Sequence, residues 1–143
     1  MSTEENKALI RRLVEEFLNK GNTAVAEALV AEDHVALDPS PGQPQGREGL
    51  IANIARMRTA FPDLQCTIED MVAEGDKVAV YYVWRGTHQG EFLGIPPTGK
   101  RVTVPCVNFD YCVAGQCKKS RFMMDTMSLM QQLGVVPPPG QAN

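Results

Sequence analysis

The chain has 143 residues, and 14 Lys and Arg against 17 Asp and Glu give it a formal net charge of −3. This length fits one domain with its own hydrophobic core, and a weakly acidic chain without a basic cluster argues against a nucleic-acid partner. No run approaches the roughly 20 apolar residues of a membrane span, so no membrane partner is expected either.

The first half of the chain predicts three helices. Apolar residues recur at helical spacing between Leu9 and Leu18, a Ser-Thr-Glu-Glu segment before them suits a helix start, and Gly21 ends the pattern. Asn22 or Thr23 can cap a second, short helix. A third helix carries one apolar face, formed by Leu50, Ile51, Ile54 and Met57.

The second half of the chain predicts strands. Residues 34–38 form an earlier, short strand candidate, followed by a Pro- and Gly-rich loop at 39–46. After Pro62 the apolar residues alternate with a period of two, which is typical of strands. The third strand should bend or bulge near Pro105, and residues 128–134 can add one or two closing helical turns. The four strands are expected at 64–75, 77–88, 99–113 and 117–127.

Helices followed by a long meander predict an α+β fold, with the N-terminal helices packed on the concave face of a curved, mostly antiparallel sheet. No linker or repeat divides the chain, so we expect a single domain over 1–143, with a core at about 5–134 and a tail at 135–143. A curved sheet covered by helices encloses a cone-shaped pocket, which is a natural site for a small molecule.

The connection GTHQGEFLGIPPTGKRV, at 86–102, is much longer than the roughly two to five residues of an ordinary hairpin. Its glycines allow unusual backbone conformations, and Pro96-Pro97 stiffens the return. We therefore interpret it as a rim, in which Phe92, Leu93 and Ile95 fold over one end of the sheet or onto a partner subunit.

Several of these segments together resemble a known family. The series PGQPQGREGL, FPDL, IEDMVAEGDKVAV, GTHQGEFLGIPPTGKRVTV and LMQQLG, within about residues 5–134, is similar to the SnoaL-like polyketide cyclases. The resemblance implies the nuclear-transport-factor-like (cystatin-like) cone fold shared with ketosteroid isomerase. It also implies a small apolar or polyketide-like substrate, ring closure by intramolecular aldol condensation, and no metal or organic cofactor.

The same resemblance implies that Asp125 is the general acid/base. An aldol closure removes a proton from carbon and delivers one to an alkoxide, and a carboxyl in an apolar cavity has its pKa raised toward the range where it can do both. The residues around Asp125 are apolar enough to form such walls. The alternative is that Asp125 is the N-cap of the helix that follows it.

Five further residues are candidates for the site. His88 is either a catalytic hydrogen-bond donor at the mouth of the pocket or an anchor for the long loop. Arg121 and Met123 share one strand face with Asp125; if that face is inward they bind substrate, and if it is outward Arg121 is solvated. Tyr81 and Phe92 are the aromatic candidates for substrate contacts. His34 is expected to be exposed.

The chain departs from the family pattern at two places, and these departures leave the function open. Ala36 and Leu37 stand where many members have Asp-His, and residues 119–121, Lys-Ser-Arg, stand where many have Glu-His-Trp. An enzyme is the leading hypothesis. A non-catalytic binding protein and a dimerisation or assembly module are the alternatives.

Two expectations concern partners and compartment. The strand at 77–88 is apolar on both faces, and helices of one chain can cover only one of them, so we expect a homodimer built on the outer face. The polar N-terminal segment lacks a signal-peptide core, and the four cysteines show no C-x-x-C pair that would suggest zinc. A cytoplasmic protein with reduced thiols is expected.

Overall fold

The computed structural model describes residues 2–137, and residues 138–143 of the expected tail lie outside that range. None of the helices in the described part of the chain is long and apolar enough to cross a membrane. In chain order the elements are α1 Thr3–Arg12, the π-helix η1 Leu13–Leu18, α2 Thr23–Leu29, β1 Val30–Ala36, α3 Gly46–Ala60, β2 Gln65–Glu74, β3 Lys77–Thr87, β4 Arg101–Val113, β5 Gln116–Met124 and α4 Thr126–Leu133.

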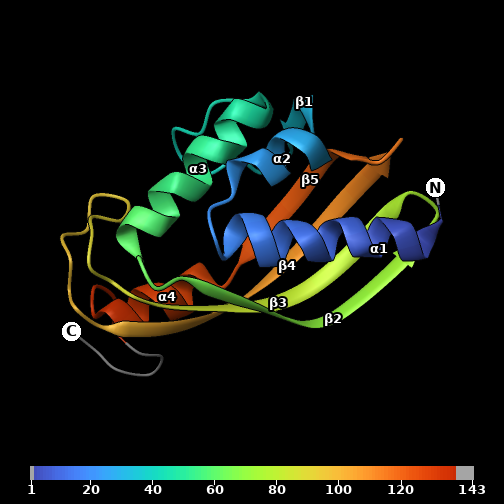
Figure 1. Cartoon of the computed structure of the whole chain (residues 1–143). Coiled ribbons are helices and arrows are strands. Elements are labelled where there is room, and N and C mark those ends of the chain that lie inside the picture. Colours follow the sequence, from blue (N-terminus) through green and yellow to red (C-terminus); the bar gives the residue numbers. More distant parts are fainter. Residues whose placement is uncertain (1, 138–143) are drawn as a thin grey trace.

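The five strands form one sheet in the order β1-β5-β4-β3-β2. All neighbours are antiparallel except β1, which runs parallel to β5 at the edge. Helices α1, α2 and α3 lie over one face of the sheet, while α4 lies at the end that also holds the connection between β3 and β4 (Figure 1). The predicted α+β class, with N-terminal helices on one face of a mostly antiparallel sheet, is confirmed.

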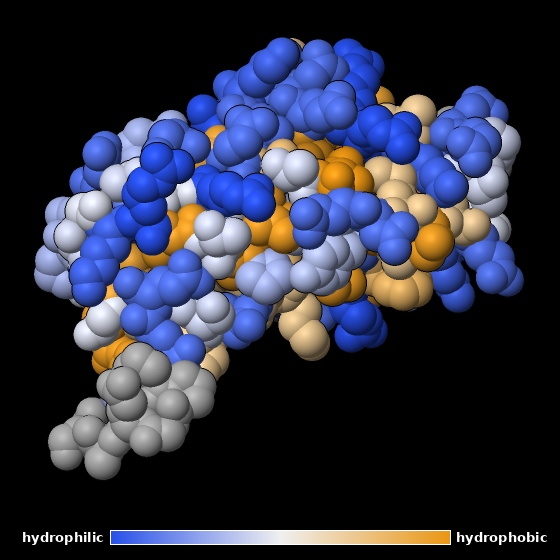
Figure 2. Space-filling model, turned by 90° about the horizontal axis from the view of Figure 1, so that it is seen from below, coloured by the Kyte–Doolittle hydropathy of each residue, from blue (hydrophilic) through white to orange (hydrophobic). Residues whose placement is uncertain are grey.

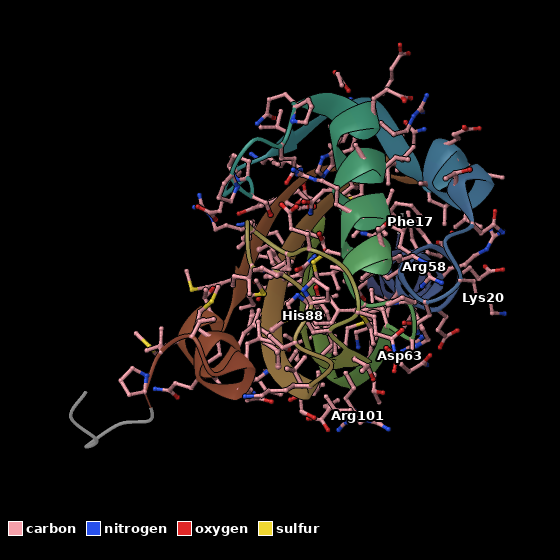
Figure 3. All side chains as sticks on the ribbon, turned by 90° about the vertical axis from the view of Figure 1, so that its left-hand side faces the viewer. Phe17, Lys20, Arg58, Asp63, His88 and Arg101 are labelled. Carbon is pink, nitrogen blue, oxygen red and sulfur yellow. The ribbon has the colours of Figure 1, made fainter. Side chains whose placement is uncertain are left out.

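Local chemistry explains the first helical unit. Ser2 and Glu5 form a capping box that satisfies the first backbone N–H groups of α1. At the other end, the Arg58 guanidinium of α3 donates to the carbonyl oxygens of Leu18 (2.9 Å) and Asn19 (2.8 Å), which would otherwise lack partners after η1. Figure 3 shows Arg58 beside Phe17. The end of η1 is thus tied to α3.

Strand β3 runs through the centre of the sheet and shows the predicted alternation. Val78, Val80, Tyr82 and Trp84 are buried toward the helices, whereas Tyr81 faces outward and is exposed. The hydrophobic core therefore lies between the helices and this inner face of the sheet.

Of the two distortions expected near Pro105, a bend or a bulge, the bulge is absent: the pairing of Pro105 with Val83 is regular. The pairing of β4 with β5 ends at Cys106 and Met124, and the Pro105 carbonyl accepts a bond from Asp125 N just beyond it. The absent N–H therefore removes no bond from the ladder. Strand β1 also starts earlier than expected, at Val30, because it pairs with β5.

Candidate functional site

A cavity of about 1010 Å³ is lined by residues of the helices and of the inner face of the sheet. Its walls come from η1, α3, the inner faces of β3, β4 and β5, and the loops at 38–43 and 91–93. Most of the lining is apolar. Polar side chains gather in two places: an exposed set that includes Asp38, Arg56 and Glu91, and a buried set around Asp110. The volume would hold a molecule of several rings.

The long connection forms part of the cavity wall, as the sequence predicted. Backbone N–H groups of Gln89 and Gly90 donate to the Ala60 carbonyl at the end of α3, at 2.9 and 3.1 Å. Phe92 is buried, lines the cavity, and packs edge-on against Phe61 with ring centroids 5.4 Å apart. The segment is thus a rim that closes one end of the sheet.

His88 holds this rim in place. The side chain is fully buried, its Nδ1 accepts the backbone N–H of Thr98 at 3.2 Å, and its ring stacks on Phe61. Figure 3 shows His88 among the side chains between α3 and the sheet. It does not belong to the cavity lining. This geometry matches the expected loop anchor and places His88 away from the pocket mouth that its proposed catalytic position requires.

Asp125 lies outside the cavity that the sequence analysis expected around it. It is the exposed N-cap of α4, where its Oδ1 accepts the Ser128 backbone N–H at 3.0 Å. The reason is the end of β5: pairing stops at Met124, so the chain turns at Asp125 into the helix. The alternative assignment of Asp125 as a helix cap describes this position.

Because Asn caps helices about as well as Asp, Asp125→Asn should leave stability almost unchanged, while Asp125→Ala should cost about 1 kcal/mol. The measurement is the free energy of unfolding of both variants in urea. Equal destabilisation by Asn and Ala would contradict the cap assignment.

The orientation of β5 also differs from the one in which Arg121 and Met123 would face inward and bind substrate. Arg121 points outward, 3.7 Å from Asp38 in an exposed ion pair. Met123 is 71% exposed, although it is among the residues that line the cavity. Residues of the opposite phase, Ser120, Phe122 and Met124, line the cavity instead. Strand β3 behaves likewise: Tyr81 faces outward, and Tyr82 is the inward tyrosine.

The buried polar set centres on Asp110 of β4, which the sequence analysis did not single out. The residue is 4% exposed and lines the cavity. Its Oδ1 accepts the Ser120 hydroxyl at 2.7 Å and the Cys117 thiol at 3.8 Å. Burial raises the pKa of Asp110 to about 6, although hydrogen bonds from Ser120, Asn108 and Cys117 oppose the shift.

His34 extends this set from β1. Its Nε2 lies 2.9 Å from the Ser120 hydroxyl oxygen, and it is 2% exposed, so the expectation of an exposed His34 was wrong. Burial lowers the pKa of His34, which keeps the ring neutral at pH 7. On the other side, the Tyr82 hydroxyl donates to Asn108 at 3.3 Å. The cavity thus contains one carboxyl that titrates near neutrality, held by neutral polar groups.

One signal in the sequence could have revealed Asp110. In β4 the even-numbered positions from Val102 to Cys112 face inward, and Asp110 is the single acidic residue among them. A carboxyl on an otherwise buried strand face requires hydrogen-bond partners. The partners Ser120 and Cys117 come from β5, however, and their proximity to Asp110 is a property of the sheet.

No group of three or more His, Cys, Asp or Glu side chains in residues 2–137 is arranged to hold a metal ion.

Comparison with known proteins gives consistent matches. The sequence model of the SnoaL-like polyketide cyclases matches residues 8–133. The aklanonic acid methyl ester cyclase DnrD of Streptomyces peucetius is 30% identical over 143 residues, which cover 94% of this chain and 92% of DnrD. Among solved structures, TsrD from Streptomyces laurentii superposes with a TM-score of 0.87 at 26% identity, covering 95% of this chain and 99% of TsrD. IdmH from Streptomyces antibioticus gives 0.80 at 31% identity, covering 90% and 98%.

Proposed function

The chain belongs to the SnoaL-like polyketide cyclase family, and we propose that it is an enzyme in which Asp110 is the general acid/base. The substrate is a neutral, largely apolar, polyketide-like molecule that carries a carbonyl group and an acidic C–H. The reaction is a ring closure or isomerisation of the aldol type, which needs no metal or organic cofactor.

The observation that carries this proposal is the Asp110 carboxyl, buried in the wall of a cavity with mostly apolar walls, where burial raises its pKa to about 6. General acid/base catalysis is most efficient when the pKa of the group lies near the working pH. Asp110 is a group of this kind and lines the cavity, whereas Asp125 lies outside the lining.

In the proposed reaction the ionised Asp110 takes a proton from the acidic carbon and leaves its electron pair on the substrate as an enolate. The enolate carbon attacks the carbonyl of the same molecule and forms the new C–C bond. The resulting alkoxide then takes the proton back from the neutral carboxyl. Apolar walls favour this cycle because water is kept from the enolate.

The main alternative is a binding protein that uses the same cavity without turnover, since the family's Asp-His and Glu-His-Trp positions hold other residues here. A pure assembly module is less favoured, because its cavity would be filled by side chains and this one is open. An enzyme should turn over its substrate and lose that turnover in Asp110→Asn, while its ligand affinity stays intact. A binding protein should bind the ligand without turnover, both as wild type and as Asp110→Asn.

We also propose a homodimer built on the outer face of the sheet. Tyr81, Val107 and Met123 are consecutive partners across β3, β4 and β5, and all three are exposed, as is the neighbouring Phe109. Figure 2 views the molecule from below and shows apolar side chains gathered between polar ones. An exposed group of this kind favours burial against a second copy.

Val107→Lys should turn the dimer into a monomer, because it puts an unpaired charge at the centre of the three-strand row. The measurement is the molar mass by light scattering at micromolar concentration. Val135→Lys changes an exposed valine outside the sheet and should leave the dimer intact. A wild-type protein that is already monomeric would contradict the proposal.

The cytoplasm remains the proposed compartment. Cys66, Cys106, Cys112 and Cys117 are all buried and free, which suits a reducing environment.

A further inference from the structure

Two buried side chains and one half-buried side chain, from three strands, form a continuous series of hydrogen bonds. His34 of β1, Ser120 of β5 and Asp110 of β4 are joined by contacts of 2.9 Å (His34 Nε2 to Ser120 Oγ) and 2.7 Å (Ser120 Oγ to Asp110 Oδ1). All three line the cavity. The other ring nitrogen of His34, Nδ1, is buried and has no partner within the described residues.

When Asp110 is ionised, the number of protons shared by His34, Ser120 and Asp110 determines which side chain donates each of these hydrogen bonds. Ser120 has a single hydroxyl proton and three neighbours that could accept it: Asp110, His34 and, at 3.3 Å, the Cys117 sulfur. The carboxylate is the closest of them, at 2.7 Å, and a charge-assisted bond is about twice as strong as a neutral one. The hydroxyl therefore donates to Asp110, so His34 must donate to Ser120 from Nε2.

We propose that His34 is a positioning residue that acts through Ser120: it directs the Ser120 hydroxyl onto Oδ1 of Asp110 and leaves Oδ2 as the oxygen that exchanges a proton with the substrate. This inference rests on the proposed role of Asp110 as the general acid/base. It adds the identity of the reacting oxygen and the tautomer of His34, both of which can be measured without a substrate.

The bonding supports this division of the carboxyl. The two hydrogen bonds that come from β5, donated by Ser120 and Cys117, both reach Oδ1, and Asn108 of β4 adds a further hydrogen bond to the carboxyl. When a substrate carbon loses its proton, the proton bonds to Oδ2, its electron pair stays on the substrate, and Asp110 becomes neutral. The bond from Ser120 to Oδ1 persists through the transfer, so His34 keeps its Nε2–H tautomer in both states of Asp110.

Four titratable groups near this series of hydrogen bonds each keep one charge state around neutral pH. Burial raises the pKa of Tyr82 and of Cys117 far above neutrality, and that of Cys112 to about 12. Asp33 is paired with Lys118 at 3.0 Å, and this bond lowers its pKa. The residues of α1 and η1 that line the cavity are apolar. The remaining charged neighbours are Arg47 of α3, bonded to Val30 O, and Asp38, Arg56 and Glu91 of the cavity lining.

The first test is nitrogen NMR of the whole protein labelled in histidine. The chain has two histidines, so His88 is a built-in reference: its Nδ1 accepts the Thr98 N–H, which requires the Nε2–H tautomer at every pH where it is neutral. We expect His34 to show the same neutral Nε2–H tautomer on both sides of the Asp110 titration. A switch of His34 to the Nδ1–H form as Asp110 takes up its proton would place that proton on Oδ1 and overturn the assignment.

The second test follows the pKa of Asp110 by carboxyl carbon NMR. Ser120→Ala removes a charge-assisted bond and should raise this pKa by about one to two units. His34→Leu should raise it in the same direction, because the hydroxyl is no longer directed onto Oδ1. His34→Gln puts an amide N–H at the position of Nε2 and should restore the wild-type value.

An Asp110 pKa that is unchanged in His34→Leu would overturn the positioning role and leave His34 as a space-filling side chain. If the Leu variant does not fold, the wild-type tautomer and the Ser120→Ala and His34→Gln titrations still decide the point. These outcomes are separate from the proposed function, which fails only if Asp110→Asn retains turnover.

Discussion

Asp110→Asn should lower turnover by about 10²–10⁴-fold, the usual contribution of a general acid/base, because the amide keeps the shape of the carboxyl but cannot carry a proton. Ligand affinity should survive, since the amide oxygen can still accept the bonds from Ser120 and Cys117. In the wild type, the rate should rise with pH through about 6, as Asp110 ionises to its basic form.

The same substitution should stabilise the fold at neutral pH. The pKa of Asp110 is raised in the folded protein from 3.8 to about 6, so between these values the folded state binds more protons than the unfolded state. Stability of the wild type therefore falls as pH rises through this window, and above it the buried carboxylate costs up to about 3 kcal/mol. The Asn variant lacks this cost.

The measurements are a turnover assay with a ligand-binding assay, and urea unfolding at about pH 4 and pH 8, below and above most of this window. Asp125→Asn is the matched control, because it removes a carboxyl of an exposed cap outside the cavity and should leave turnover unchanged. Normal turnover in Asp110→Asn together with a loss in Asp125→Asn would return the catalytic role to Asp125.

Gly90→Ala should displace the rim and weaken ligand binding by about tenfold. A Cβ at Gly90 would lie 2.5 Å from the Thr59 carbonyl oxygen and 3.2 Å from Ala60 Cα, so the segment cannot keep its two bonds to the end of α3. Overpacking of this kind costs about 1–3 kcal/mol of stability. Phe92 would then leave the cavity wall, and part of its apolar contact with the ligand would be lost. A loss of about 1.4 kcal/mol of binding free energy corresponds to the expected tenfold loss of affinity.

The control for the rim is Gly94→Asn. Gly94 has a positive φ of 80° but nothing within 4 Å of an added Cβ, and Asn tolerates this conformation better than most residues. Stability and ligand affinity should therefore stay close to the wild-type values. A Gly90→Ala protein that binds ligand as tightly as Gly94→Asn would show that the rim plays no part in the site.

Several features of this protein follow from the sequence alone, because local interactions decide them. Helical spacing up to Leu18, alternation along β3 and the Gly-Pro composition of the rim are properties of contiguous residues, and each appears in the fold where it was predicted. The segments that resemble the SnoaL-like family predicted the topology and, with it, the α+β class. The ends of the elements are less well determined by the sequence. A shift of the end of β5 by one residue decides whether Asp125 is in a strand or caps a helix.

The composition of the site was decided by the tertiary structure. The phase of β5 depends on its register against β4, which is irregular between Tyr111 and Cys112, and this register turns Ser120 inward and Arg121 outward. His34 is buried because β1 joins the sheet in parallel beside β5, which brings it to Ser120 across 86 positions of the chain. Asp110 acquires its raised pKa from the burial that these contacts create. Sequence periodicity determines which residues share a face, but only the assembled sheet determines which face is covered and what meets there.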